Sequence, residues 1–203
     1  MNSYPEKTWD NFCSRYGVAE KGVPLFEVNN NVVDLIEIGR DKRLFLKRSK
    51  AMETNVIQEV KKVLSDHKSK ADHFEGIIYM MYRLLSDRIV PLYIGKAEKY
   101  GKNGGNLSEN IRDIERNAHK FCRWGYGYAY HVGDLSAIVC PGHPQEKRRG
   151  KYVKWANALF EDFPSKTPRL KFPVYFWIHA WEKGNIGIWE DFGEISLTFS
   201  NIF

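Results

Sequence analysis

The sequence EGIIYMMYRLLSDRIVPLYIGK, residues 75–96, contains two apolar runs separated by a short polar segment. Both runs are rich in β-branched and large apolar residues, which favour strands. Ser86-Asp87-Arg88 supplies a polar turn between them, so the simplest prediction is a β-hairpin. This hairpin would place Tyr79 on one strand beside Tyr93 on the other.

After the hairpin, the sequence predicts a basic helix from Asn106 to Arg123. Asn106 and Glu109 have the spacing of a capping box, and apolar residues recur at helical spacing at Leu107, Ile111, Ile114, Ala118 and Phe121. A cationic stripe borders this apolar face and consists of Arg112, Arg116, His119 and Arg123. The stripe suits a polyanion such as DNA. For each residue taken alone, the alternative is a solvated polar face.

The order GIIY at 76–79, YIGK at 93–96 and then an arginine-bearing helix resembles the GIY-YIG nuclease superfamily. The resemblance implies an α+β fold, with a small mixed β-sheet flanked by helices. It implies that Tyr79 acts as general base or orients water, and that Tyr93 positions water or phosphate. It also implies a catalytic arginine, for which Arg112 is the first candidate and Arg123 the second. Lys96 and Arg112 are expected to lower the pKa of Tyr79 by their charge.

The same resemblance implies one divalent ion, Mg²⁺ or Mn²⁺, held by a glutamate on a helix after the last strand. Glu194 lies nearest the expected start of that helix and is the first candidate for the ligand. Glu161 and Glu190 are the alternatives. A further alternative is a shortened member of the family with impaired catalysis.

Composition indicates a globular chain with a modest basic excess. The 203 residues include 31 Lys+Arg and 25 Asp+Glu, which give a net charge of +6. This balance permits nucleic-acid binding without requiring it. No stretch approaches the roughly 20 apolar residues of a membrane span, and three cysteines without framework spacing fit a reducing compartment. We therefore expect a cytoplasmic protein with no membrane partner.

Residues 1–72 are expected to form an N-terminal α/β extension. The pattern predicts a short helix at 6–16, short strands at 24–28, 32–38 and 43–46, and a helix that Thr54 caps. The polar stretch 65–72 is the candidate linker. Residues 73–203 would then form the nuclease-like domain.

Three later segments have a predicted structure. Residues 124–131 alternate aromatic residues with glycine, which is typical of a strand, although exposed aromatic residues also stack unpaired bases. A helix is expected at 146–163, and the cations Lys147, Arg148 and Arg149 at its start either bind a partner anion or are simply solvated. The apolar run at 173–181 predicts a central strand beside the hairpin.

Zinc receives weaker support. Cys122, His131, Cys140 and His143 are possible ligands, but only Cys140 and His143 have a compact chelating spacing. The function we expect is a metal-dependent endonuclease that hydrolyses DNA phosphodiester bonds, in a restriction or defence role. The alternative is a non-catalytic nucleic-acid-binding module derived from such a nuclease.

Overall fold

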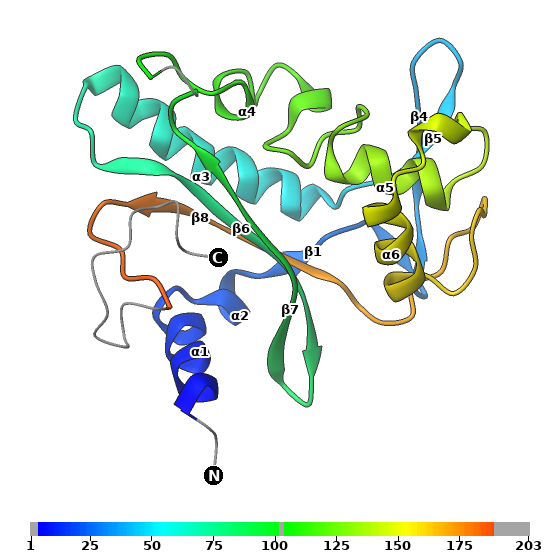
Figure 1. Cartoon of the computed structure of the whole chain (residues 1–203), viewed down its shortest axis with the longest axis horizontal. Helices are drawn as coiled ribbons and strands as arrows, with labels where there is room; N and C mark the ends of the chain where they lie inside the picture. The colour runs from blue at the N-terminus through cyan, green and yellow to red at the C-terminus, as the bar shows by residue number, and fades with distance from the viewer. Residues whose placement is uncertain (1–3, 102–103, 189–203) are drawn as a thin grey trace.

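The predicted hairpin forms one side of a four-stranded sheet in the computed structural model, which describes residues 4–101 and 104–188. Strands β6 (Phe74–Leu85) and β7 (Arg88–Glu98) pair antiparallel, with Tyr79 opposite Gly95 and Met81 opposite Tyr93. Strand β8 (Tyr175–Glu182) pairs with the other side of β6, and β1 (Val23–Pro24) completes the order β1-β8-β6-β7 (Figure 1). The α+β class is therefore confirmed.

Two predictions about this sheet are settled by its pairing. The apolar run at 173–181 does form an interior strand beside the tyrosine hairpin, as expected. The expectation of a mixed sheet is wrong, because every pair in the sheet is antiparallel.

Alternation along β6 divides the core into two parts. Tyr79 and Met81 face a large core that also includes residues of helix α3 (Lys50–Ser69). Ile78 and Met80 face the opposite side, where helix α1 (Tyr4–Arg15) covers the sheet (Figure 1). Because successive strand residues point to opposite faces, the motif tyrosine lies on the α3 side.

Helix α3 differs from its prediction at both ends. Ser49, rather than Thr54, caps it, since the Ser49 hydroxyl accepts a hydrogen bond from the Met52 amide at 2.9 Å. The predicted linker at 65–72 is also wrong, because the helix continues to Ser69. Asp66 is buried there and accepts hydrogen bonds from the amides of His73 and Phe74.

The N-terminal third contributes directly to the sheet. It supplies β1 and α3, and two small hairpins lie between them: β2 (Val28–Asn29) with β3 (Val32–Val33), and β4 (Leu35–Ile38) with β5 (Arg43–Leu46). A four-residue helix, α2 (Val18–Lys21), follows α1. Leu25 and Val56, from before residue 72, belong to the same core as Ile77 and Phe176.

The predicted helix from Asn106 to Arg123 is wrong beyond its first turn. Helix α4 spans only Glu109–Arg112, and a short 3₁₀ turn follows at Ala118–Lys120. Cys122 and Arg123 have positive φ values of 44° and 68°, which a helix does not allow. The four cations of the expected stripe therefore do not share one helix face.

The segment after this loop also differs from expectation. Residues 124–130 form no strand, and helix α5 (His131–Val139) begins where the predicted strand would end. Helix α6 (Gly150–Leu159) is shorter than the helix expected at 146–163 and packs beside α5 (Figure 1). Gly150 opens α6, and a 3₁₀ turn at Gln145–Lys147 precedes it. Among the described residues, no helix is long and apolar enough to cross a membrane.

Candidate functional site

Tyr79 and Tyr93 lie side by side on the α3 face of the sheet. Their ring centroids are 6.3 Å apart, and the planes of the two rings are inclined by 35°. The Tyr79 hydroxyl donates a long hydrogen bond, 3.5 Å, to the carbonyl oxygen of Lys96. Tyr79 is 2% exposed, whereas Tyr93 is half-buried. Tyr93 is therefore the tyrosine that solvent reaches more easily.

Gly95 is required by this packing. A Cβ atom at residue 95 would lie 2.6 Å from Cε2 of Tyr79 and 2.9 Å from its hydroxyl oxygen. No other residue type leaves room for the Tyr79 ring directly opposite. The glycine of the YIG motif is thus explained by the close approach of Tyr79 on the neighbouring strand.

Arg123 brings a positive charge to the tyrosine pair. It is exposed, and its charge partly opposes the rise that burial causes in the pKa of Tyr79 and of Tyr93. No carboxylate of the described residues forms an ion pair with its guanidinium. Its own backbone is fixed, because the Arg123 carbonyl accepts a hydrogen bond of 2.7 Å from the His131 amide.

A wall of aromatic side chains surrounds the tyrosine pair. His131 at the start of α5 lies 4.9 Å from the Tyr93 ring, and Trp155 on α6 lies 5.0 Å from it. The His131 Nδ1 shares a hydrogen bond of 2.8 Å with the Tyr152 hydroxyl, whereas its buried Nε2 has no hydrogen-bond partner among the described residues. Lys151 places its ammonium nitrogen 4.3 Å from the centre of the Tyr93 ring.

Beside this wall lies a hollow of about 450 Å³, between the end of β7 and α4. Arg123, Lys96, Glu98 and Glu109 contribute to its lining, together with Ala97, Tyr100, Gly101, Ser108 and Asn110. Arg123 thus connects the open hollow to the buried tyrosine face, which makes it the residue best placed to meet an anion bound there.

Burial sets the protonation of the central groups. It raises the pKa of Tyr79 above its usual value, Cys122 and Tyr93 add to that effect, and Arg123 opposes it. Burial also lowers the pKa of His131 to about 3, and the charges of Lys151 and Arg123 act in the same direction. Tyr79 is therefore a neutral phenol and His131 a neutral imidazole near pH 7.

The structure does not support the expected effect of Lys96 and Arg112 on the pKa of Tyr79. Lys96 lies opposite Ile78, which faces α1, so its side chain leaves the sheet on the side away from Tyr79. Its ammonium group forms an ion pair with Glu98 at 2.8 Å. Arg112 donates to Asp113 at 3.1 Å and does not line the hollow.

The predicted nucleic-acid-binding residues fall in two places. Arg116 and His119 are exposed in the turns after α4. Lys147, Arg148 and Arg149 precede α6, whose residue Lys151 covers Tyr93. Arg149 also lies 3.7 Å from the buried carboxylate of Asp134. The second group is thus close in sequence to a lysine that contacts the site.

Sequence reasoning missed the contribution of α5 and α6. The apolar run after His131 and the spacing of Lys151 and Trp155, four residues apart, were the available signals for helices with one face at the site. The aromatic and glycine alternation before His131 favoured a strand instead. Gly125 explains part of this pattern, because a Cβ there would lie 2.1 Å from the His119 carbonyl oxygen.

The described carboxylates nearest the tyrosine pair are engaged in ion pairs. No group of three or more His, Cys, Asp or Glu side chains in the described ranges is arranged to hold a metal. In the hollow, Glu98 is paired with Lys96 and Glu109 with Lys120. Glu161 pairs with Arg169. Glu190 and Glu194 lie outside the described residues.

The weaker zinc prediction loses its compact ligand pair. Both ring nitrogens of His143 are engaged, Nδ1 with the Tyr128 hydroxyl at 2.9 Å and Nε2 with the Leu44 carbonyl at 2.7 Å. Neither nitrogen is left to bind a metal. Burial also raises the pKa of Cys140 to about 12, which disfavours the thiolate that zinc requires.

Comparisons of the chain with protein-family models, with curated proteins and with solved structures find no match.

Proposed function

We propose that this protein is a nuclease that hydrolyses phosphodiester bonds of DNA. The observation that carries the proposal is the meeting of Tyr79 and Tyr93, on adjacent strands, with the charges of Arg123 and Lys151. The chain order of two tyrosine strands, a basic segment and a third strand is also the order that the resemblance to GIY-YIG nucleases implies.

The side chains at the site match two needs of the reaction. Charge that develops on the phosphoryl oxygens must be stabilised, and the planar guanidinium of Arg123 can donate to two such oxygens at once. Lys151 adds a second positive charge over the Tyr93 ring. The attacking water must be oriented, and a neutral phenol can both donate and accept a hydrogen bond. We therefore assign Tyr79 and Tyr93 to water and phosphate positioning rather than to proton abstraction.

The cofactor in this proposal is one Mg²⁺ or Mn²⁺ ion, with Glu194 as its carboxylate ligand. Magnesium needs at least one anionic oxygen, and the residues of the described site do not supply a suitable group. A bound ion would stabilise negative charge on the phosphate. The ion-paired state of Glu98 and Glu109 is the reason to prefer Glu194.

A cleavage assay tests this function. Purified protein is incubated with supercoiled plasmid and with single-stranded DNA, in Mg²⁺, Mn²⁺ or EDTA. We expect metal-dependent cleavage by the wild type, and a loss of about 100-fold in Tyr79→Phe, a size typical of losing one positioned catalytic group. Tyr175→Phe, at a tyrosine that opens β8 and does not line the hollow, is the control for removal of a hydroxyl.

The second candidate function is a nucleic-acid-binding module without catalysis. The observation that favours it is the burial of Tyr79, whose hydroxyl already donates to the carbonyl oxygen of Lys96. DNA binding that weakens with salt, combined with no cleavage in either metal, would replace the nuclease proposal by this one. Absence of DNA binding at low salt would contradict both.

A further inference from the structure

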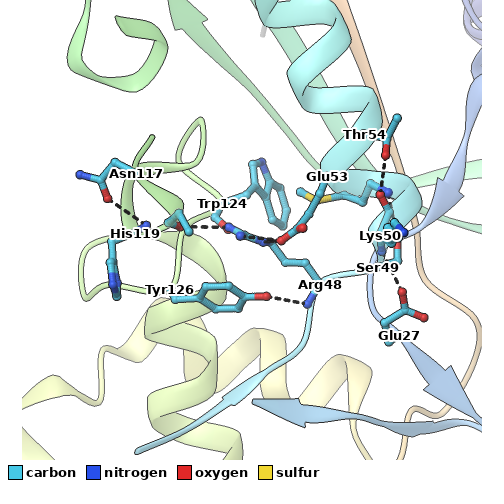
Figure 2. A network of polar contacts seen from close by, with 12 residues as sticks. Glu27, Arg48, Ser49, Lys50, Glu53, Thr54, Asn117, His119, Trp124 and Tyr126 are labelled. Atoms are coloured by element: carbon cyan, nitrogen blue, oxygen red, sulfur yellow. Dashed lines mark hydrogen bonds and ion pairs between the residues drawn. The ribbon is translucent and has the colours of Figure 1, made fainter. Parts of the chain in front are cut away.

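Arg48 is a buried arginine that lies between helix α3 and the loop that carries Arg123. It is 3% exposed, and it follows β5 immediately before the cap of α3. Its Nε and Nη2 atoms both donate to Oε1 of Glu53, at 3.0 and 2.7 Å (Figure 2). A buried guanidinium needs such a partner, because an uncompensated charge in the core is strongly unfavourable.

The remaining donors of Arg48 point into the loop. Its Nη1 donates to the carbonyl oxygens of Ala118, at 3.2 Å, and of Trp124, at 2.9 Å (Figure 2). The guanidinium carbon lies 4.3 Å from the centre of the Phe121 ring and 4.0 Å from that of Tyr126. One side chain thus contacts the loop at both ends and in the middle, and the loop spans residues 118–126.

This loop needs external support because no strand pairing or α-helix holds it. Cys122 and Arg123 both have a left-handed backbone, and each such residue costs of order 1–3 kcal/mol unless its surroundings impose it. The carbonyl groups bound by Arg48 lie on either side of these two residues. The amides of His131 and Gly133 also donate to the carbonyls of Arg123 and Gly125, but the side chain of Arg48 bonds on both sides of the left-handed pair.

We propose that Arg48, oriented by Glu53, is a positioning residue that fixes loop 118–126 and thereby holds Arg123 at the hollow. The inference rests on the proposed nuclease function for its catalytic consequence. Arg48 itself is buried behind the loop and does not line the hollow. Its effect on cleavage would therefore pass through Arg123.

The test compares Arg48→Lys and Glu53→Gln with a control, Val56→Ala. Lysine keeps the charge but cannot reach a carboxylate and two carbonyl groups together. Val56 is fully buried one turn after Glu53 on α3, so its truncation lowers stability, and it takes part in none of the hydrogen bonds of Arg48. If Arg48→Lys does not fold, Glu53→Gln carries the test, because Glu53 is partly exposed and glutamine keeps its shape.

Single-turnover cleavage and DNA affinity are measured for each variant. We expect Arg48→Lys to slow cleavage about 10- to 100-fold, the range for a misplaced catalytic group, with DNA affinity changed less than twofold. In an Arg123→Lys background the same substitution should have little further effect, because coupled residues are not additive. Equal slowing by Val56→Ala, or full additivity, would overturn the proposal.

Amide hydrogen exchange separates this inference from the proposed function. Arg48→Lys should lose protection in residues 118–126 but not in β6 or β8, whether or not the protein cleaves DNA. Unchanged loop protection would overturn the positioning role. A wild type that shows no cleavage would overturn the nuclease proposal, while local loss of protection would still support the positioning of the loop by Arg48.

Discussion

Arg123 and Arg112 provide a matched pair of arginines with different expected effects. Arg123 acts on both tyrosines, whereas Arg112 is exposed and donates to Asp113. We expect Arg123→Ala to reduce kcat at least 100-fold, a size typical of losing a donor that stabilises transition-state charge. Arg112→Ala should change kcat less than threefold. The opposite ranking, measured on the same DNA substrate, would show that the arginine is wrongly assigned.

His131 should make stability depend on pH. Its folded-state pKa, about 3, lies below the usual value near 6.5, so between these values the unfolded chain binds more protons. Stability contributed by the neutral imidazole is therefore present above pH 6.5 and is lost as the pH falls towards 3. The slope can reach about 1.4 kcal/mol per pH unit for one group.

Urea unfolding at pH 7, 6, 5 and 4 measures this slope. The His131→Asn substitution should reduce this slope by up to the contribution of one proton, whatever the stability of the variant at pH 7. His119→Asn removes an exposed histidine and should leave the slope unchanged. Equal slopes in the wild type and His131→Asn would mean that folding does not lower the pKa of His131.

Among the elements, α3 is joined to the hairpin by a buried ion pair. The Asp66 carboxylate accepts a hydrogen bond of 2.7 Å from the ammonium group of Lys99, and both side chains are almost fully buried. Burial opposes ionisation of Asp66, but the hydrogen bonds from Lys99 and from the amides of His73 and Phe74 outweigh it and lower the pKa to about 2. This carboxylate thus connects the end of α3 to β6 and β7.

We expect Asp66→Asn to destabilise the fold by about 3 kcal/mol, because it leaves Lys99 buried with a much weaker partner. The loss should be full at pH 7 and should shrink as the pH falls from about 4 towards 2, where the wild-type carboxylate is also protonated. Glu115→Gln, which removes a surface ion pair with Lys61, is the control and should cost less than 1 kcal/mol. A cost below 1 kcal/mol for Asp66→Asn, measured by chemical denaturation, would contradict this account.

The elements also show what the sequence could reveal. The hairpin and β8 were predictable because apolar runs and a polar turn are local signals. The segment at 113–126, which includes loop 118–126, was not predictable. Its apolar residues repeat at helical spacing, and its left-handed residues are held by Arg48, which lies about 75 positions earlier in the sequence. Asp66 was read as part of a linker for the same reason, because its partner Lys99 is distant in sequence.

The functional site shows the same difference between local sequence signals, which could be interpreted, and contacts between distant residues, which could not. Tyr79 and Tyr93 were identified because the motif is contiguous on two paired strands. Lys96 was assigned to the wrong face of the sheet, although the alternation of strand residues would have corrected this, since Lys96 lies three residues after Tyr93. The arrangement of His131 and Trp155 depends on how α5 and α6 pack, which no local pattern specifies.

For the molecule as a whole, residues 1–72 and 73–188 share one sheet and one core. We therefore expect a fragment of residues 73–203 to be unfolded alone, because it lacks β1 and the helix that covers Tyr79. Mixing it with a fragment of residues 1–72 should restore the far-ultraviolet circular dichroism and the cooperative unfolding of the intact chain. Cooperative unfolding by the 73–203 fragment alone would instead establish an independent domain.

The whole molecule also contains three cysteines, Cys13, Cys122 and Cys140, all of them free and buried. Burial raises the pKa of each thiol to about 12, and a neutral, enclosed thiol reacts slowly with alkylating reagents. A maleimide dye should therefore label the native protein slowly, whereas a cysteine introduced at the exposed position of Arg116 should be labelled rapidly. Because Cys122 directly precedes Arg123, the rate at which Cys122 is labelled would report how often the loop opens, without any engineered probe.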